Sequence, residues 1–364
     1  MTTRRAHVRR IATRSPDDVS GLEAAIADGR IVPGAVVAIF GKTEGNGLVN
    51  DWTRGLAARS LHDCLTRHVG AEAAGRVCLV MSGGTEGGLS PHLTVFEART
   101  DAAPAVPAAL AIGRAHTADL RPEAIGRPAQ IEAVARGVRA ALDEAGIADP
   151  ADVDFVQVKC PLLTSDRIAE ALSRDRACAT PDTLKSMGLS RAAAALGVAV
   201  ALGEVAMPDA DAIGRDLSLC SSRASVSAGI ELMGHEIVVL GRGAGWSGPL
   251  RIDHATMADP LDVEPVRAAL ARLGLGAAGQ LAPEQRRRLV ALLAKAEAPS
   301  DGRLRGLRHA MLTDSDISAT RHARGFTGGV LAGLVGHAEL YVSGGAEHQG
   351  PDGGGPVAII AEVD

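Results

Sequence analysis

Three short stretches decide the fold: VCLVMSGGTEG at 77–87, SRASVSAGIEL at 222–232 and AELYVSGGAEH at 338–348. Each contains the pattern Ser-x-Gly-x-Glu, and the members are Ser82, Gly84 and Glu86, then Ser227, Gly229 and Glu231, then Ser343, Gly345 and Glu347. Apolar runs typical of strands follow the three stretches at Leu93–Phe96, Glu236–Leu240 and Val357–Ile360. A pattern that recurs within one chain indicates internal repeats.

The lysines repeat in the same way. Lys and Arg together number 38, yet only four are lysines, and three of these end strand-like runs. The runs are VVAIFGK ending at Lys42, VDFVQVK ending at Lys159 and LVALLAK ending at Lys295. A buried lysine can lose its proton, which an arginine cannot, so retained lysines in an arginine-rich chain are candidates for chemistry.

An arginine near the start of a helix-like segment lies between each lysine and the next serine. The candidates are Arg54 in TRGLAA, Arg191 in SRAAAA and Arg324 in ARGFTG. Arg321 competes for the third place, although the Arg-Gly dipeptide favours Arg324. The order Lys, Arg, Ser therefore occurs three times, and the alternative is a set of unrelated turns after strands.

The remaining pattern predicts a mixed α/β chain. A first strand is expected around Ala6–Ile11, and helices at Asp17–Asp28, Ala129–Ala145 and Val263–Leu273. Pro, Gly and Asp accumulate at 102–107 and 248–260, which suggests units spanning 1–104, 105–250 and 251–364. We expect an α/β fold of three similar units around a pseudo-threefold axis, with the sheets inward as a barrel-like core and the helices outside.

Composition excludes several classes of function. The 364 residues carry a net charge of −5 and contain four Phe, two Trp and one Tyr, which argues against nucleic-acid binding. No apolar run reaches the roughly 18 residues of a membrane helix. The first 16 residues are Arg-rich like a transit peptide, but lack a secretory apolar region. The five scattered cysteines form no CxxC, so we expect a cytoplasmic protein; they are Cys64, Cys78, Cys160, Cys178 and Cys220.

The repeated residues suit nucleophilic catalysis on a small ring. A serine becomes a nucleophile when a base such as neutral lysine takes its proton, and burial or nearby positive charge lowers a lysine pKa. Small residues after the serine leave backbone N–H groups free to hold a carbonyl oxygen. Threefold repetition of such donors fits a ring with alternating carbonyl and N–H groups, and predicts hydrolysis of a cyclic amide.

At these residues the chain resembles the cyanuric acid hydrolase/barbiturase family of ring-opening amidohydrolases. The resemblance runs the whole length through FGKTEGNG, NDWTRG, VMSGGTEGG, VQVKCPLL, SRASVSAG and YVSGGAEHQGPDGGGPVAIIAEV. It implies one central site of three Lys/Ser pairs, in which only the middle pair reacts: Ser227 as nucleophile and Lys159 as base. The resemblance implies that the substrate is bound by Arg54, Arg191, Arg324, Ser82, Gly83, Ser227, Ala228, Ser343, Gly344, Lys42 and Lys295. It also implies a homo-oligomer, by resemblance a tetramer.

The resemblance leaves two possible substrates, cyanuric acid and barbituric acid. Members of the family convert cyanuric acid to carboxybiuret, which yields biuret and carbon dioxide, or barbituric acid to ureidomalonate. Three filled arginine positions and three filled serine positions match a threefold-symmetric ring, so cyanuric acid is favoured. A protein that only binds a small anion is another reading, as is a zinc-dependent amidohydrolase. The eleven histidines show no HxH or HExxH spacing, which weighs against zinc.

The sequence also suggests why the middle pair would differ. Glu44 follows Lys42 by two residues, and Glu297 follows Lys295 in the same way, so each carboxylate could share a strand face with its lysine. Lys159 is followed by Cys160-Pro161 instead, and we expect it to be the lysine most easily neutralised. Nearby serines are rival nucleophiles, but only Ser227 keeps the register of the repeat; the rivals are Ser221, Ser222 and Ser225.

The C-terminal glycine-rich loop at 344–355 is a turn or a cation site. Backbone carbonyls with one carboxylate and one amide oxygen would suit a hard cation such as Mg²⁺ or Ca²⁺. The resemblance implies a structural metal here, held by Glu297, Ala346, Gln349, Pro351 and Gly354, with Gly350 as a further candidate. Two other signals are set aside: GRGAGWSG at 241–248 lacks a complete GxGxxG, and Cys160 lacks the setting of a nucleophile.

Overall fold

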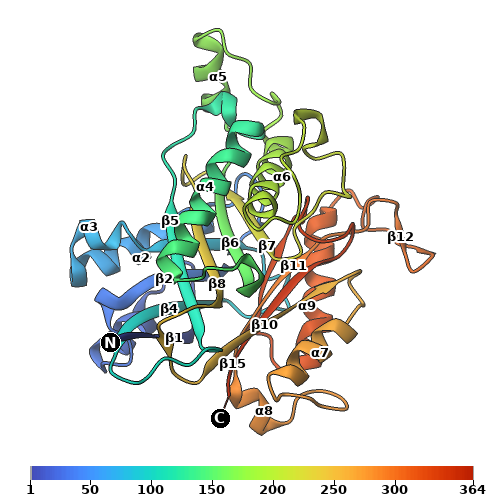
Figure 1. The fold of residues 1–364 in the computed structure, drawn as a ribbon. Coiled ribbons are helices and arrows are strands. Elements are labelled where there is room, and N and C mark those ends of the chain that lie inside the picture. The colour runs from blue at the N-terminus through green and yellow to red at the C-terminus, as the bar shows by residue number, and fades with distance from the viewer. Residues whose placement is uncertain (1, 364) are drawn as a thin grey trace.

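The computed structural model describes residues 2–363, which form a mixed α/β fold with three main sheets. Figure 1 shows strands in the middle of the molecule and helices around them. The helices α2 and α3 lie on one side, α4 and α6 on a second, and α7 and α9 on a third. Their bounds are α2 Trp52–Val69, α3 Ala71–Ala74, α4 Pro128–Ala145, α6 Thr183–Ala201, α7 Glu264–Arg272 and α9 Ala319–Val335.

The three sheets share one order of four strands. The first contains β1 Thr3–Ala12, β2 Val36–Thr43, β3 Cys78–Gly83 and β4 His92–Asp101, in the order β3-β2-β4-β1, with β9 Trp246–Ser247 added at the edge. The second, in the matching order β7-β6-β8-β5, contains β5 Leu110–His116, β6 Val153–Pro161, β7 Ala224–Gly229 and β8 Glu236–Arg242. The third, in the order β14-β11-β15-β10, contains β10 Leu250–Met257, β11 Leu289–Ala296, β14 Tyr341–Gly344 and β15 Gly355–Glu362.

The pairing of these strands is also the same in each sheet. Within each shared order of four strands, the first two strands are parallel and the other pairings are antiparallel, and the added β9 pairs with β1 in parallel. A register shift interrupts the second and third strands at one place in each sheet, just before Ala38, Phe155 and Ala291. Each of these residues precedes a lysine of the repeat by four positions, so the three sheets are built alike down to their irregularities.

Helices carry the chain between the parallel strands, because a parallel pair needs a long crossover. Helix α2 connects β2 to β3, α6 connects β6 to β7, and α9 connects β11 to β14. Capping side chains fix two of their starts: Asp51 accepts from the Thr53 N–H, and Asp182 accepts from the Leu184 N–H. The other helices and short strands are α1 Ser20–Ala27, α5 Ser165–Ser173, α8 Pro283–Arg288, β12 Arg303–Leu304 and β13 Leu307–Arg308.

One central core joins the three sheets. It contains Phe40 from the first, Phe155 from the second and Leu293 from the third, all fully buried. The Phe40 ring lies 5.6 Å from the ring of Tyr341, which belongs to the third sheet. Two separate clusters lie between the first and third sheets and their own helices, and a smaller one lies between α4 and α6. Burial of apolar area between sheets therefore holds the units together, and burial under the helices holds each unit together.

The structure confirms the expected strands and helices within a few residues at their ends. The sheets do not close into one barrel anywhere in residues 2–363, and the barrel-like arrangement of the core stays a prediction. Residues 250–257, expected to fall in a connection, form β10. The unit boundaries at 104 and 250 stay a prediction.

Helix α6 qualifies the expectation about membrane helices. Its 19 residues have a mean hydropathy of 1.2 in the most apolar window, enough to span a membrane by length and composition. However, 67% of that window is buried inside the protein. The helix packs against α4 and β7, which accounts for its apolar composition as that of a core helix.

Candidate active site

The three lysines lie directly opposite the three serines. Each sheet pairs the lysine strand with the serine strand, and the register aligns Lys42 with Ser82, Lys159 with Ser227 and Lys295 with Ser343. All six side chains are buried. The Nζ atom lies 3.4 Å from Oγ in the first pair and 3.2 Å in the third. The three pairs thus share one register, but among residues 2–363 a hydrogen bond from Nζ to Oγ joins only the first and third pairs, while Lys159 Nζ contacts Met81 and Glu231.

The lysines also link the sheets in a closed cycle. Lys42 Nζ donates to the Val342 carbonyl at 2.6 Å, Lys159 Nζ to the Met81 carbonyl at 2.6 Å, and Lys295 Nζ to the Val226 carbonyl at 2.8 Å. Each acceptor is the residue immediately before the serine of another sheet. The three serine strands β3, β7 and β14 contact one another, so the three pairs meet at one place.

The three arginines reach across the units in the opposite sense. Arg54 Nη1 donates to the Ala228 carbonyl at 2.7 Å, which follows Ser227. Arg191 forms a double hydrogen bond with Glu347, at 2.7 and 2.6 Å. Arg324 Nε donates to Glu86 at 2.9 Å. Every arginine therefore touches the Ser-x-Gly-x-Glu segment of another sheet.

The competition between Arg321 and Arg324 is resolved by burial. Both arginines bind Glu86, but the Arg324 side chain is 3% exposed and that of Arg321 is 33% exposed. Arg54 and Arg191 are also buried. One expectation needs correction: Arg191 lies in the middle of α6 and not near its start, because that helix begins early, at Thr183.

The expected acidic partner of Lys42 is wrong, whereas that of Lys295 is confirmed in part, because burial lowers the pKa of Lys295 and the charge of Glu297 opposes that shift. Glu44 is exposed, and Glu297 accepts backbone N–H groups from Ala298 at 3.0 Å and Ala346 at 3.1 Å. Lys159, expected to have no carboxylate neighbour, forms an ion pair with Glu231 at 2.8 Å. For Lys42 the argument from i and i+2 spacing fails because β2 ends at Thr43, one residue after the lysine, and Glu44 lies outside the strand.

Burial lowers the pKa of all three lysines. For Lys42 burial and then Arg324 hold the pKa well below its usual range. For Lys295 burial and then Arg191 lower the pKa to about 7. Burial also lowers the pKa of Lys159, while the Glu231 carboxylate opposes the shift. Burial raises the pKa of the Cys160 thiol to about 11, which makes Cys160 a poor nucleophile.

The comparisons with known proteins agree with this architecture. The family model described as amidohydrolase ring-opening protein matches residues 7–362. The chain belongs to the family of ring-opening amidohydrolases. It is 63% identical over 359 residues to a cyanuric acid amidohydrolase of Azorhizobium caulinodans, covering 98% of each chain. It is 50% identical over 363 residues to the cyanuric acid amidohydrolase of Pseudomonas sp. strain ADP, covering 98% of this chain and 99% of the relative.

Solved structures show the same fold. The crystal structure of the cyanuric acid hydrolase from A. caulinodans superposes with a TM-score of 0.92 at 61% identity, covering 99% of each chain. A second cyanuric acid hydrolase, described as an evolutionary innovation by structural concatenation, has a TM-score of 0.94 at 49% identity. It covers 99% of this chain, and all of its own length (100%) is matched.

The rival serines of this ring-opening amidohydrolase are engaged elsewhere or out of register. Ser221 Oγ accepts from the Ala224 N–H at 3.0 Å, and Ser222 Oγ donates to Glu204 at 2.6 Å. Ser225 pairs with Gln157, two positions before Lys159. Only Ser227 lies opposite a lysine in this stretch.

The C-terminal loop of the amidohydrolase presents oxygen atoms of the type that a hard cation prefers. Burial raises the pKa of Glu297, so a nearby cation would stabilise its charged form. The carbonyls of Ala346 and Pro351 each accept a single backbone hydrogen bond, at 2.9 and 2.8 Å, which leaves a lone pair on each. The Gln349 amide oxygen accepts from the Val226 N–H at 2.6 Å, which likewise leaves one lone pair on that oxygen. These residues fit a hard cation.

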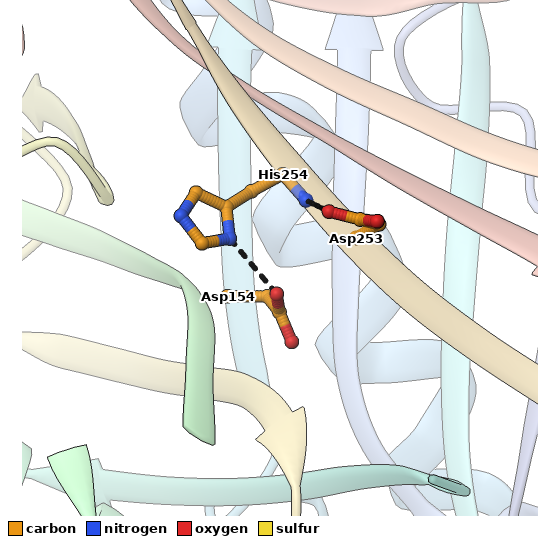
Figure 2. A group of neighbouring side chains, drawn as sticks. All are labelled: Asp154, Asp253 and His254. Atoms are coloured by element: carbon orange, nitrogen blue, oxygen red, sulfur yellow. Dashed lines mark hydrogen bonds and ion pairs between the residues drawn. The ribbon is translucent and has the colours of Figure 1, made fainter. Parts of the chain in front are cut away.

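A group of titratable side chains away from the lysines lies between the second and third sheets (Figure 2). His254 Nδ1 lies 2.8 Å from an Asp154 oxygen, and the His254 N–H donates to Asp253 at 2.7 Å. Arg272 donates to both Asp253 oxygens, at 2.6 and 2.8 Å. Because Arg272 already neutralises Asp253, we interpret the group as a contact that ties β10 to β6.

Sequence reasoning missed the part played by the repeated glutamates. Their recurrence four residues after each serine was the available signal, since Glu86, Glu231 and Glu347 complete the pattern that defines the repeats. This recurrence could not identify the partners of the three glutamates, because every partner lies far away in the sequence. His348 is likewise structural: its Nε2 accepts from the Gly214 N–H at 2.8 Å.

Proposed function

We propose that the protein is a cyanuric acid amidohydrolase that opens the ring with a serine nucleophile and a lysine base. One observation carries the proposal: three Lys/Ser pairs in identical register, linked to one another in a cycle. The names of the relatives, all cyanuric acid amidohydrolases at 50 to 63% identity, support the choice of substrate. We propose that a pseudo-threefold axis passes between the pairs.

Substrate binding follows from the threefold set of donors. Arg54, Arg191 and Arg324 would each face one carbonyl of the ring, where a guanidinium donates to oxygen. The remaining donors would come from the residue pairs Ser82-Gly83, Ser227-Ala228 and Ser343-Gly344, with Lys42 and Lys295 lining the wall. A planar ring with three equivalent carbonyls can satisfy all of these donors together; a ring with one carbon in place of a nitrogen keeps the three carbonyls but loses one N–H group and the threefold symmetry.

The chemistry would run at the middle pair. Lys159 takes the proton of Ser227 while Oγ forms a bond to a ring carbonyl carbon. The bond from that carbon to the ring nitrogen then breaks, and the nitrogen takes the proton from the Lys159 ammonium. Backbone N–H groups near Ser227 stabilise the negative oxygen. Water releases the open chain from Ser227 as carboxybiuret, which loses carbon dioxide to give biuret.

A structural cation at the C-terminal loop is part of the proposal. Glu297 and the carbonyls of Ala346, Gln349, Pro351 and Gly354 would hold Mg²⁺ or Ca²⁺, with Gly350 as a further ligand. Such an ion would supply rigidity to the loop. Gln349 connects the loop to Val226, the residue before the nucleophile, so the ion would brace one wall of the site. We further propose a homotetramer in the cytoplasm, which chromatography coupled to light scattering and fractionation of the source cells would test.

The test is turnover of the ring. The protein incubated with cyanuric acid should remove the ring absorbance and release biuret and carbon dioxide, whereas barbituric acid should react more slowly. Ser227→Ala and Lys159→Ala should abolish turnover far more completely than Lys42→Ala or Lys295→Ala. Equal losses among the lysine variants would contradict the choice of the middle pair. Binding without turnover in the wild type would favour a protein that only binds a small anion.

A further inference from the structure

The glutamate of the repeat has a different partner in the middle segment. Glu347 holds Arg191 through two hydrogen bonds, and Glu86 holds Arg324. By the same pattern Glu231 would hold Arg54. Instead its carboxylate lies 2.8 Å from Lys159 Nζ, on a strand of its own sheet.

Arg54 fits this departure. Its Nη1 and Nη2 atoms donate to the carbonyls of Ala228 at 2.7 Å and Leu48 at 2.6 Å, and its Nε lies 3.9 Å from a carboxylate oxygen of the buried Asp51, so these groups take the place of the Glu231 carboxylate. Within residues 2–363 the buried Arg54 Nε atom has no hydrogen-bond partner. Arg54 thus occupies the same position as the arginines of the other two units, although Glu231 pairs with Lys159 and not with Arg54.

The backbone after the serine explains how Glu231 turns. Gly84 and Gly345 have left-handed φ angles of +97° and +79°, whereas Gly229, at the same place in the repeat, is not among the glycines with positive φ. The chain therefore leaves Ser227 in another direction. Arg167 fixes this path, because its Nη2 donates to the carbonyls on both sides of Glu231, Ile230 at 2.8 Å and Leu232 at 3.2 Å.

The Lys159–Glu231 ion pair is buried at both ends, because both carboxylate oxygens of Glu231 are hidden from solvent. The Lys159 side chain is 1% exposed, and that of Glu231 is 14% exposed. Glu231 lines a cleft of about 390 Å³ together with Arg167 and His235. The groups whose charges act on Lys159 are Glu231, Arg54, Cys160 and Glu236. Of these, Glu231 alone forms an ion pair with the amine among residues 2–363.

We propose that Glu231 is a positioning residue, whose carboxylate anchors the Lys159 amine and so selects the middle pair as the reactive one. The inference rests on the proposed roles of Ser227 and Lys159. A lysine that is only buried is a poor proton donor, because its neutral form dominates. In the ring opening, Lys159 must both take the Ser227 proton and return it to the ring nitrogen, and a general acid–base needs a pKa near the working pH. The carboxylate provides for the second transfer.

The titration of the lysine itself tests the proposal without any substrate. Only four lysines are present, so lysine labelled at the side-chain nitrogen gives four NMR signals, and Lys159→Arg identifies the one of interest. Glu231→Gln keeps the shape and removes the charge. It should move the Lys159 midpoint down by one pH unit or more, because an opposite charge within about 4 Å shifts a pKa by roughly 1–3 units. An unchanged midpoint would overturn the inference.

Kinetics on cyanuric acid provide the matched controls. Glu86→Gln and Glu347→Gln remove the same charge at the same place in the repeat, but from an arginine. Glu231→Gln should lower kcat at least roughly tenfold, as loss of general acid–base function does, and move the acid limb of kcat to lower pH. The two control variants should raise KM, and the acid limb of their pH profile of kcat should stay at the wild-type pH. Glu231→Asp should restore the limb in part. An equal shift of the limb in all three Gln variants would contradict the inference.

The two proposals fail in different ways. If wild-type protein leaves cyanuric acid intact, or Ser227→Ala retains turnover, the proposed function is wrong, and the lysine titration still reports on the ion pair. If those tests succeed and Glu231→Gln changes neither the titration nor the limb, only the role of Glu231 is wrong. Circular dichroism of each variant separates loss of fold from loss of positioning.

Discussion

Gly345→Ala should impair substrate binding through Arg191 and also cost about 1–2 kcal/mol of stability. Gly345 has a φ of +79°, and a Cβ added there would lie 2.5 Å from Cζ and Nε of Arg191. A left-handed residue other than glycine costs about 1–2 kcal/mol. The Arg191 guanidinium must also move, and the substrate ring then loses its hydrogen bond from Arg191. Loss of a charge-assisted hydrogen bond costs about 1.5–3 kcal/mol, which is roughly 10- to 150-fold in kcat/KM.

A second glycine separates strain from displacement. Gly203 lies just beyond the end of α6, the helix that carries Arg191, and has a φ of +71° with no atom within 4 Å of an added Cβ. Gly203→Ala should therefore lose about 1–2 kcal/mol in urea unfolding with kcat/KM for cyanuric acid unchanged. Gly345→Ala should lose similar stability and also kcat/KM.

A double-mutant cycle completes the test. If alanine at 345 acts through Arg191, adding Gly345→Ala to Arg191→Ala should change kcat/KM little further. Equal kcat/KM for the two single glycine variants would refute the reasoning. So would full additivity with Arg191→Ala, because the alanine would then act through some other group.

Three further predictions concern stability. Burial and Arg191 lower the pKa of Lys295 to about 7, so above that pH the unfolded chain binds more protons at this side chain than the folded protein does. Wild-type stability relative to Lys295→Met should therefore rise from pH 7 towards 10 in urea unfolding, and a flat difference would contradict the shift. EDTA should lower the Tm of the wild type and leave Glu297→Gln, which has lost a proposed ligand, unchanged; equal responses would remove the cation from the proposal. Phe40→Ala should lower the unfolding free energy by about 3–5 kcal/mol, because the ring lies in the core shared by the three sheets, and a loss below 1 kcal/mol would mean that the units hold together by other contacts.

Much of the fold followed from local patterns. Apolar runs ending in a lysine and runs ending in Ser-x-Gly-x-Glu became the parallel strands of each sheet. Helix starts and periodicity placed α4 and α7. The start of α6 was harder to predict, because the helix begins at Thr183, well before Arg191.

The electrostatic pairing in the site could not be predicted in this way. Glu44 follows Lys42 by two residues, yet it is exposed, whereas Glu231 lies 72 positions from Lys159 and contacts it. The i and i+2 rule holds only while a strand continues. Beyond the strand end the path of the chain depends on turns such as the one at Gly229, whose conformation differs from that of Gly84.

The sequence by itself determined the threefold recurrence of lysine, arginine and serine, because each copy lies on a strand or helix that its neighbours in the chain specify. Tertiary structure alone decided which charges meet. Each lysine donates to a carbonyl of another sheet, and each arginine reaches a loop of another unit. Such contacts arise only when the apolar faces of three sheets pack into one core, and that packing makes the middle lysine unlike the other two.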